Sequence, residues 1–370
     1  MSDALLLVGD SETNQNLYYK THFLAGDPFV YFEHGDRRVL VVGGMERGRA
    51  EKESIVPEIR TFEDFNFRQL VSELGDRTRA FATMLQRLTE GAGEITVEGT
   101  FPVMYAAALR AQGVTLRVDN DLLDTERRTK SEEEVDAIER AQAATERAVA
   151  HAFEILSSSE THDSILHYNG VPLTAERLRT EIETLLVRDG MVPVTPIVAP
   201  GPGAADPHWL GEGPIRAGQA VVFDVFPRDK ASRYYADMTR TVVRGEPEPQ
   251  LRAMFDAVVA GQEAAFRMIR AGANGREVHE ATAQAMRDAG FDREDDGPRY
   301  IHSTGHGVGL NIHEGPGLGT RDEELREGDV ITVEPGLYDP EIGGVRMEDM
   351  VVVTADGYRN LTNFPKRFVL

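Results

Sequence analysis

The stretch YIHSTGHGVGLNIHE, residues 300–314, carries the strongest chemical signal in the chain. It holds three of the ten histidines, His302, His306 and His313, with glycines between them. Neutral imidazole is the commonest metal-ligating side chain, and glycine lets the backbone approach another group closely or adopt a positive φ. Taken alone, the stretch is equally compatible with a glycine-rich loop bearing surface histidines. Residues upstream and downstream decide between these two interpretations.

Four carboxylates stand in apolar, strand-like runs of the second half of the chain. They are Asp224 in VVFDVF, Asp237 in YYADMTRT, Glu334 in VEPG and Glu348 in GVRMEDMVVV. A buried acid is unfavourable unless it is paired or binds a cation, and for one acid alone a salt bridge is the ordinary explanation. Four such acids together with His306 favour a dinuclear site, in which two divalent ions neutralise the carboxylates. Metals about 3.5–4 Å apart share a bridging hydroxide that serves as nucleophile near neutral pH.

The composition limits the kinds of site and partner. The chain contains no cysteine, so any metal must be held by His, Asp and Glu, which suits Mn, Co, Fe or Zn better than a soft-ligand site. Its net charge of −22 argues against nucleic acid and anionic membranes as partners. Only five of the 40 basic residues are lysines. So acidic a surface suits high salt, and we interpret the chain as halophilic, which activity highest below ~0.1 M salt would contradict.

Targeting signals are missing from the sequence as it is given. The apolar run at residues 4–8 is too short for a signal peptide, and no basic residue precedes it. Nowhere does the sequence approach the ~18 uninterrupted apolar residues of a membrane span. We therefore expect a cytoplasmic protein without a membrane partner.

At 370 residues the chain is expected to form two domains. Residues 1–124 alternate short strands with helical patterns, which predicts a small α/β domain. After the linker DTERRTK, Ser131 opens a capping box with Glu134, and the periodicity predicts a helix to about residue 156. A second helix is predicted over residues 175–188.

The rest of the second domain, residues 125–370, mixes loops, helices and strands. The segment IVAPGPGAADPHWLGEGPI, residues 197–215, is too rich in Gly and Pro for regular structure and carries His208 beside the only Trp. Strand patterns are predicted over four segments and helices over two, which together indicate an α+β fold. The strands are 220–226, 234–243, 330–338 and 345–354, and the helices 248–269 and 276–289.

In order and local context, the four carboxylates and His306 resemble the five metal ligands of the pita-bread metallopeptidases. That family includes methionine aminopeptidase, aminopeptidase P (Xaa-Pro aminopeptidase), prolidase and creatinase. The matching pieces are DMTRT, HSTGHGVGLNIHE, VEPG and GVRMEDM, which make the resemblance strong over about residues 130–370. The first domain is more weakly similar to the creatinase/prolidase N-terminal domain, through NLYYKTHFLAGDPFVYF. The resemblance implies an α+β pita-bread catalytic domain behind a smaller α/β domain, and a homodimer.

The resemblance also assigns the metal ligands. Asp224 and Asp237 would bind one divalent ion, with Asp237 bridging to the other ion. His306 and Glu334 would bind that second ion, with Glu348 also bridging. Manganese is the preferred metal, with Co, Zn or Fe as alternatives. Glu334 would in addition carry the proton of the attacking water as general base.

Four further residues receive roles at the substrate. His208, in DPHW, resembles a substrate-loop histidine that hydrogen-bonds the peptide or shuttles a proton. His302 and His313 would polarise the scissile carbonyl and stabilise the oxyanion. Arg346 would orient carboxylates or a substrate terminus.

The full ligand set, the additional domain and His302 are features shared with aminopeptidase P and prolidase. These enzymes cleave the bond before proline, a tertiary amide. We therefore expect an Xaa-Pro aminopeptidase whose substrate carries proline at its second position. The alternatives are a prolidase restricted to dipeptides, a metal hydrolase acting on another substrate, and a non-catalytic binding protein on the same fold.

The sequence departs from the family pattern near the first ligand. Phe226 stands where the family often has glycine, and Asp224 and Asp237 are thirteen residues apart instead of about eleven. An insertion in the hairpin turn absorbs the difference without moving either ligand. We expect this chain to differ from its relatives at the substrate rim, residues 227–233.

Overall fold

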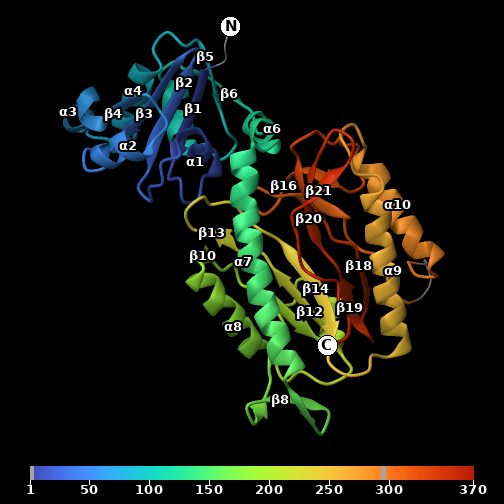
Figure 1. Cartoon of the computed structure of the whole chain (residues 1–370). Helices are drawn as coiled ribbons and strands as arrows, with labels where there is room; N and C mark the ends of the chain where they lie inside the picture. The colour runs from blue at the N-terminus through green and yellow to red at the C-terminus, as the bar shows by residue number, and fades with distance from the viewer. Residues whose placement is uncertain (1–3, 293–296) are drawn as a thin grey trace. The chain divides into compact units, whose positions relative to one another are not determined.

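The computed structural model describes residues 4–292 and 297–370 (Figure 1). The chain divides into two compact units, Met1–Glu126 and Arg127–Leu370. The family resemblance assigned to the first domain from its sequence stays a prediction. Within the described residues, every helix is too short or too polar to cross a bilayer.

The first unit contains one mixed sheet of six strands in the order β4-β3-β2-β1-β5-β6. The pairs β1–β2 and β2–β3 are antiparallel, whereas β3–β4, β1–β5 and β5–β6 are parallel. The strands are β1 (Ala4–Gly9), β2 (Phe29–His34), β3 (Arg37–Val42), β4 (Glu58–Thr61), β5 (Glu94–Val97) and β6 (Thr115–Val118). The helices are α1 (Gln15–Thr21), α2 (Arg47–Glu53), α3 (Phe67–Leu74), α4 (Arg77–Leu88), α5 (Val103–Ala111) and α6 (Leu122–Arg128).

Both faces of this sheet are buried, which explains the unbroken apolar run of β1. Successive strand residues point to opposite faces. Leu6 and Val8 join the core under α3, α4 and α5, whereas Leu5 and Leu7 join a second core with residues of α1 and α2. The first unit is therefore a three-layer α/β domain, as the sequence predicts.

The second unit packs four main helices against strongly curved antiparallel strands. The helices are α7 (Glu132–Ser157), α8 (Ala175–Arg188), α9 (Pro249–Phe266) and α10 (Gly275–Asp288). One sheet has the order β11-β12-β14, from β11 (Ile197–Pro200), β12 (Ala220–Val225) and β14 (Met238–Val243). Another has the order β16-β15-β17-β20-β21, from β15 (Gly305–Gly307), β16 (Glu314–Leu318), β17 (Val330–Val333), β20 (Asp349–Val353) and β21 (Tyr358–Asn360).

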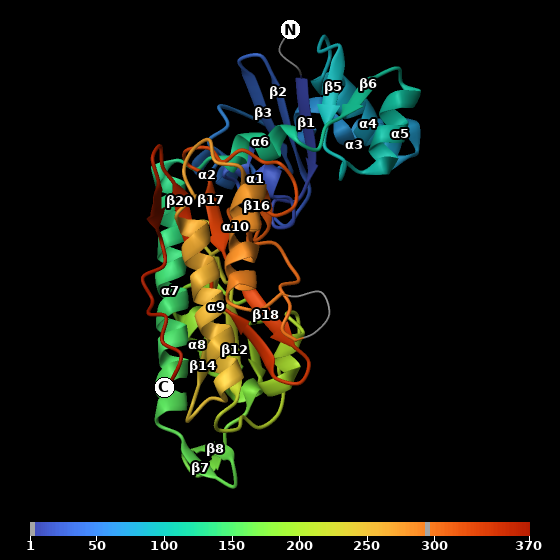
Figure 2. The ribbon, with the colours of Figure 1, turned by 90° about the vertical axis from the view of Figure 1, so that its right-hand side faces the viewer.

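Shorter strands complete this unit. The pair β18 (Gly336–Asp339) and β19 (Gly343–Arg346) forms a two-stranded ribbon, as do β10 (Met191–Val192) and β13 (Arg228–Asp229). A small three-stranded sheet consists of β7 (Glu160–His162), β8 (Ile165–Tyr168) and β9 (Val171–Pro172). Helices α9 and α10 lie side by side in both views (Figures 1 and 2), and α9 contributes to a core that also contains residues of β17 and β20.

The helix predictions in this unit are confirmed closely. Ser131 and Glu134 form the predicted capping box at the start of α7, with the Glu134 carboxylate accepting from the Ser131 amide at 2.8 Å. Helix α8 has the predicted bounds, and its N-cap Thr174 accepts from an amide in the first turn. Both helices bury an apolar stripe, so local propensity and packing agree here.

Four predictions of regular structure were wrong in detail. The strand predicted over residues 234–243 begins only at Met238. The supposed linker DTERRTK is helical through residue 128, because α6 extends to Arg128. Residues 197–200 form β11 despite the nearby prolines, since they pair with β12. The two long strands predicted near residues 330–338 and 345–354 are each broken. The first is divided into β17 and β18, and the second into β19 and β20.

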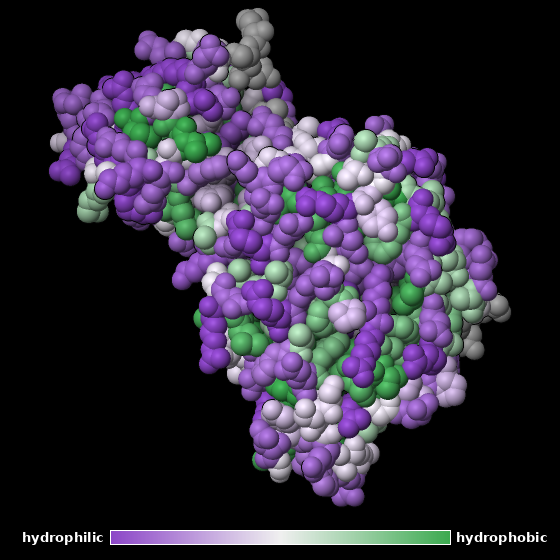
Figure 3. Space-filling view, viewed as in Figure 1, coloured by the Kyte–Doolittle hydropathy of each residue, from purple (hydrophilic) through white to green (hydrophobic). Residues whose placement is uncertain are grey.

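The surface seen in Figure 3 is mostly hydrophilic, consistent with 62 acidic residues in the chain.

Candidate metal centre

The broken strands bring the predicted carboxylates together. Glu334 lies between β17 and β18, and Glu348 between β19 and β20. Val333 is paired with Asp349 in the antiparallel ladder of β17 and β20, so the two glutamates emerge at the same end of these strands. The breaks that the sequence did not predict thus let both side chains turn into one pocket.

The other two acids come from the neighbouring sheet. Asp224 is in β12, and Asp237 immediately precedes β14. Asp224 faces Thr239 in the β12–β14 ladder, and the Glu348 amide donates to the Thr239 carbonyl at 3.0 Å. That backbone hydrogen bond joins the two sheets where the four acids meet.

His306 reaches the acids because its neighbours are glycines. A Cβ on Gly305 would lie 2.0 Å from the carbonyl oxygen of Thr332, and one on Gly307 would lie 2.3 Å from that of Gly315. Such contacts are forbidden, so only glycine allows β15 to pack between its neighbours. The expectation that glycine permits a close backbone approach is confirmed at these two positions.

The side chains of the group approach within metal-binding range. His306 Nε2 is 3.7 Å from Asp237 Oδ2 and 3.4 Å from Glu334 Oε1. One ligand atom from each of Asp237, His306 and Glu348 can be chosen so that all lie within 4.8 Å of one another. Asp237 Oδ1 and Glu348 Oε1 are buried and accept no hydrogen bond. Buried acceptors of this kind are unfavourable without a positive partner.

The carboxylates of this cluster outnumber its positive charges. Burial, and then repulsion from Glu348, raise the pKa of Asp237 and of Glu334 well above the ordinary range. Burial and the Asp224 carboxylate raise the pKa of Glu348 to about 8. Burial lowers the pKa of His306 to about 4, which keeps its imidazole neutral. Three carboxyls resist ionisation here because burial removes their hydration and because neighbouring carboxylates repel them.

Arg346 is the cation that enters this cluster from the protein. Its guanidinium forms an ion pair with Asp224, and its Nε is 4.0 Å from Glu334 Oε2. Arg346 also donates to the hydroxyl groups of Thr239 and Tyr338, each at 3.0 Å. These contacts hold Arg346 beside the carboxylates, and the roles that the family resemblance implied for it stay predictions.

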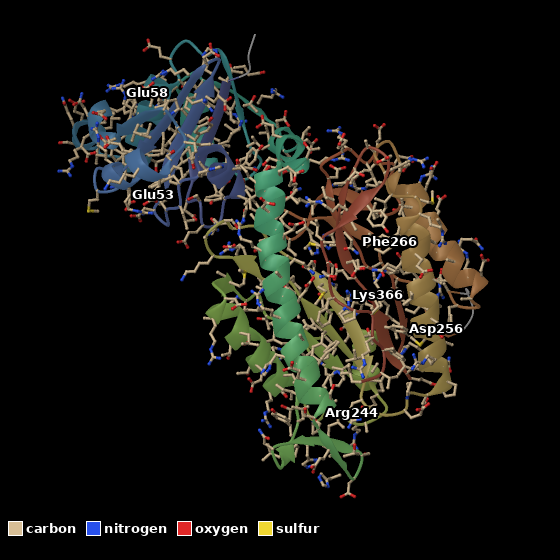
Figure 4. All side chains as sticks on the ribbon, viewed as in Figure 1. Glu53, Glu58, Arg244, Asp256, Phe266 and Lys366 are labelled. Carbon is tan, nitrogen blue, oxygen red and sulfur yellow. The ribbon has the colours of Figure 1, made fainter. Side chains whose placement is uncertain are left out.

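A second ion-pair network holds the backbone next to Glu348. The fully buried Arg240 donates to the Glu348 carbonyl and pairs with Asp349 at 2.7 Å. Lys366 Nζ lies 2.8 Å from the other Asp349 oxygen and 5.0 Å from the ring centroid of Phe266; both Lys366 and Phe266 are labelled in Figure 4. The backbone that carries Glu348 is thereby fixed on its far side.

All nine predicted site residues line a single cavity of about 600 Å³. The apolar wall of this cavity includes Phe226 and also Ile197, Ile301 and Ile312, three residues that the sequence did not single out. Phe226, noted in the sequence as a departure, therefore faces the same space as the acids. Pockets of this size and mixed lining are typical of small-ligand sites.

The three histidines outside the metal group differ in whether their ring nitrogens are already hydrogen-bonded. The Tyr338 hydroxyl accepts from Arg346, so its proton is directed to His302 Nε2 at 2.8 Å. His302 Nδ1 then donates to the Ser303 carbonyl at 2.8 Å. Both ring nitrogens of His302 are occupied by these hydrogen bonds, whereas the family resemblance implied a direct role on the scissile carbonyl.

His208 and His313 keep their ring nitrogens available. Both are exposed and line the cavity, and neither ring makes a hydrogen bond with the described part of the chain. The His313 ring stands edge-on to the His306 ring, with 4.3 Å between centroids.

Two residues that contact the site, Tyr338 and Thr239, were not predicted from the sequence. Tyr338 lies four residues after Glu334 and Thr239 two after Asp237, and this nearness to predicted ligands could have suggested them.

Known proteins match both the sequence and the fold of this chain. Residues 136–355 match the model of metallopeptidase family M24. The chain belongs to metallopeptidase family M24. Family M24 is the pita-bread family that the five residues resembled, so both that resemblance and the predicted α+β fold are confirmed.

Individual members of family M24 resemble the whole chain. The Xaa-Pro dipeptidase of Pyrococcus furiosus is 28% identical over 355 residues, covering 94% of this chain and 90% of that protein. The structure of an Xaa-Pro dipeptidase from Bacillus anthracis has a TM-score of 0.83 at 27% identity, covering 100% of this chain and 95% of that one. An X-Pro aminopeptidase structure from Thermotoga maritima MSB8, with a TM-score of 0.81 at 24% identity and coverages of 100% and 98%, shows the shared fold.

The donor set fits the divalent metals that membership of family M24 implies. Asp237, His306 and Glu348 provide carboxylate oxygens and a neutral imidazole, which suit Mn, Fe, Co or Zn. The two unpartnered carboxylate oxygens and the raised pKa values have a common explanation in a missing positive charge. Glu334 lies beside this group, whereas Asp224 is held by Arg346.

Proposed function

We propose that this chain is a metal-dependent Xaa-Pro dipeptidase, which hydrolyses the peptide bond before proline. The observation that carries the proposal is the convergence of four carboxylates, a neutral His306 and two open histidines in a cavity of about 600 Å³. The relatives with the highest full-length similarity reported above are named Xaa-Pro dipeptidases. Dipeptidase activity is therefore a better conclusion than the aminopeptidase activity that we expected first from the sequence.

The metal complement is part of this proposal. Two divalent ions, with manganese preferred, would be held by Asp224, Asp237, His306, Glu334 and Glu348. When bound, the metals would supply Lewis-acid polarisation and a nucleophile that is active near neutral pH. Binding of the second ion would require Asp224 to exchange part of its contact with Arg346 for metal coordination.

The protein side chains would position the substrate and move the proton. Glu334 lies within the cavity beside His306, where its carboxylate would accept a proton from water and return it to the leaving prolyl nitrogen. His313 and His208 have open ring nitrogens and would donate hydrogen bonds to the scissile carbonyl and the substrate carboxylate. His302, held between Tyr338 and Ser303, would act by fixing Tyr338 and Arg346.

A peptide-length assay tests the substrate. The purified protein, loaded separately with Mn²⁺, Co²⁺ or Zn²⁺, is compared on Ala-Pro and Ala-Pro-Pro. We expect kcat/KM for the dipeptide to exceed that for the tripeptide. A preference for the tripeptide would restore the aminopeptidase interpretation, and cleavage of neither peptide would point to another substrate. Metal analysis below one ion per chain after reconstitution would overturn the dinuclear site.

Assembly is proposed from the family resemblance. The chain would form a homodimer, which light scattering coupled to gel filtration measures directly. A monomeric mass at micromolar concentration would contradict this part of the proposal.

A further inference from the structure

Three basic residues at the start of the second unit form buried ion pairs with two acids from later in the chain. We call this group the clamp; it consists of Arg127, Arg128, Lys130, Glu314 and Asp329. Lys130 Nζ is 2.6 Å from Glu314 Oε1, and Arg127 Nη2 is 3.2 Å from Glu314 Oε2. Arg128 holds both oxygens of Asp329, at 2.9 and 2.8 Å. The Lys130, Arg127 and Glu314 side chains are only 1%, 4% and 5% exposed. Ion pairs this well buried interact far more strongly than surface pairs.

The backbone of the clamp is fixed as well. The Lys130 amide donates to the Gly328 carbonyl at 2.8 Å, and Thr129 forms a β-bridge with Asp329. Asp329 directly precedes β17, the strand that leads to Glu334. The clamp residues are therefore anchored to the sheet that carries the site, and Lys130 has little freedom to follow Glu314 if that residue moves.

Glu314 organises the turn at residues 309–314. Its Oε2 accepts from the Asn311 amide at 3.3 Å. A Cβ on Gly309 would lie 2.2 Å from Glu314 Oε1, so the carboxylate packs directly on this glycine. The Gly309 carbonyl in turn accepts from the Tyr235 amide at 2.9 Å, just before Asp237. The Glu314 carboxylate is thus the centre around which the turn closes.

His313 depends on this turn for its position. It precedes Glu314, its ring makes no hydrogen bond within the described residues, and its contact with the His306 ring is a perpendicular stacking. No directional interaction of its own therefore orients the ring. Its backbone must be placed by the turn, and the turn is placed by Glu314.

We propose that Lys130 and Arg127 are positioning residues for the substrate, acting through Glu314 on His313. The proposal rests on the proposed function insofar as it assigns His313 to the substrate. A purely structural ion pair would stabilise the fold without affecting substrate affinity in the folded enzyme. A positioning pair must change KM more than kcat, because His313 binds the peptide whereas Glu334 and the metals carry the chemistry.

The kinetic test compares Lys130→Met with Lys52→Met. Both variants lose one lysine charge, but Lys52 is exposed on α2. For an Xaa-Pro dipeptide we expect Lys130→Met to raise KM by about tenfold with kcat within about threefold, while Lys52→Met matches the parent. An unchanged KM in folded Lys130→Met would overturn the proposal, as would a fall in kcat alone.

Glu314→Gln keeps the shape of the side chain and provides a second variant if Lys130→Met does not fold. It should raise KM in the same way. The double variant should have a KM no more than about twofold above that of the worse single variant, because both changes remove one interaction. Multiplicative effects on KM would show that Lys130 does not act through Glu314.

Hydrogen exchange tests the clamp independently of catalysis. In Lys130→Met, amides of residues 309–314 should exchange about tenfold faster, while those of β12 and β14 remain as in the parent. If the parent protein cleaves no Xaa-Pro dipeptide, the proposed function fails, yet this measurement still decides whether Lys130 holds the turn. Unchanged exchange at residues 309–314 would overturn the clamp even in an active enzyme.

Discussion

Two buried charged regions of the second unit have opposite charge balance. The metal centre collects four carboxylates around one cation, Arg346. The clamp collects two carboxylates, Glu314 and Asp329, against three cations. In the centre, burial and mutual repulsion raise the pKa values of Asp237, Glu334 and Glu348. In the clamp, each acid is held by at least one base within 3 Å.

The difference separates a binding site from a structural element. A buried network in which every acid has a base beside it, such as the clamp, stabilises its acids from within the chain. An excess of buried acids remains unfavourable until positive charge arrives from outside, so it is retained where a cation is to bind. Both regions look alike in the sequence, where acids stand beside apolar residues. Only the partners of each acid distinguish them.

The largest expected effect concerns chemistry in the acidic centre. Glu334→Gln removes the proton acceptor with little change of shape, so kcat should fall by about 10³-fold. Steady-state assays on an Xaa-Pro dipeptide measure the change. Glu341→Gln, at an exposed site seven residues after Glu334, is the matched control. Near-normal activity of Glu334→Gln would remove this residue from the mechanism.

The next effect concerns the contribution of the clamp to the free energy of unfolding. Glu314→Gln leaves Lys130 and Arg127 buried without their carboxylate, so the free energy of unfolding should fall by about 3 kcal/mol. Urea titration followed by circular dichroism gives this number. Lys52→Met should stay within about 0.5 kcal/mol of the parent. A loss for Glu314→Gln as small as that of the control would mean that the clamp contributes nothing to stability.

Metal addition should act on the centre and leave the clamp unaffected. Mn²⁺ at about 100 times its Kd should raise the unfolding free energy of the metal-free protein by about 2.7 kcal/mol. Asp237→Asn should reduce this increment strongly, whereas Glu314→Gln should keep it even though its starting stability is lower. Thermal denaturation with and without Mn²⁺ measures both. Equal increments in Asp237→Asn and the parent would exclude Asp237 as a ligand.

The smallest expected effect has the opposite sign to the clamp variant. In the metal-free protein, Glu348→Gln should raise the unfolding free energy by at least about 1 kcal/mol at pH 8, since one pKa unit corresponds to 1.36 kcal/mol. The pKa of Glu348 is raised to about 8 in the folded protein. The parent therefore loses stability as pH rises from the unfolded-state pKa towards 8. Denaturation at pH 5 and pH 8 should show a smaller gain at pH 5; a loss at pH 8 would contradict the imbalance.

Local patterns in the sequence predicted much of the site. Each of the four acids follows or precedes apolar strand residues, so its burial was readable without knowledge of its partners. The glycines on either side of His306 signalled close packing, which the carbonyls of Thr332 and Gly315 now explain. Helix α8 was predicted with its final bounds because its N-cap and apolar face are local features.

Contacts between distant segments were not predictable in this way. Tyr338 lies in a strand that looked like a simple continuation of β17, and its link to His302 spans 36 residues. The pair Lys130–Glu314 joins residues 184 positions apart, and from the sequence Lys130 belonged to an ordinary polar linker. The strand breaks beside Glu334 and Glu348 follow from tertiary packing, and β propensity continues across both.

The sequence by itself determined the family and the α+β class and named the candidate metal ligands, because these depend on residue type and on local order. The tertiary structure alone decided that Arg346 pairs with Asp224 and that the Tyr338 hydroxyl forms a hydrogen bond with His302 Nε2. It also decided that Lys130 and Arg127 pair with Glu314, in the turn that bears His313. The physical reason is that a charge acquires its role from the charges within a few ångströms of it. Those neighbours come from segments that folding brings together.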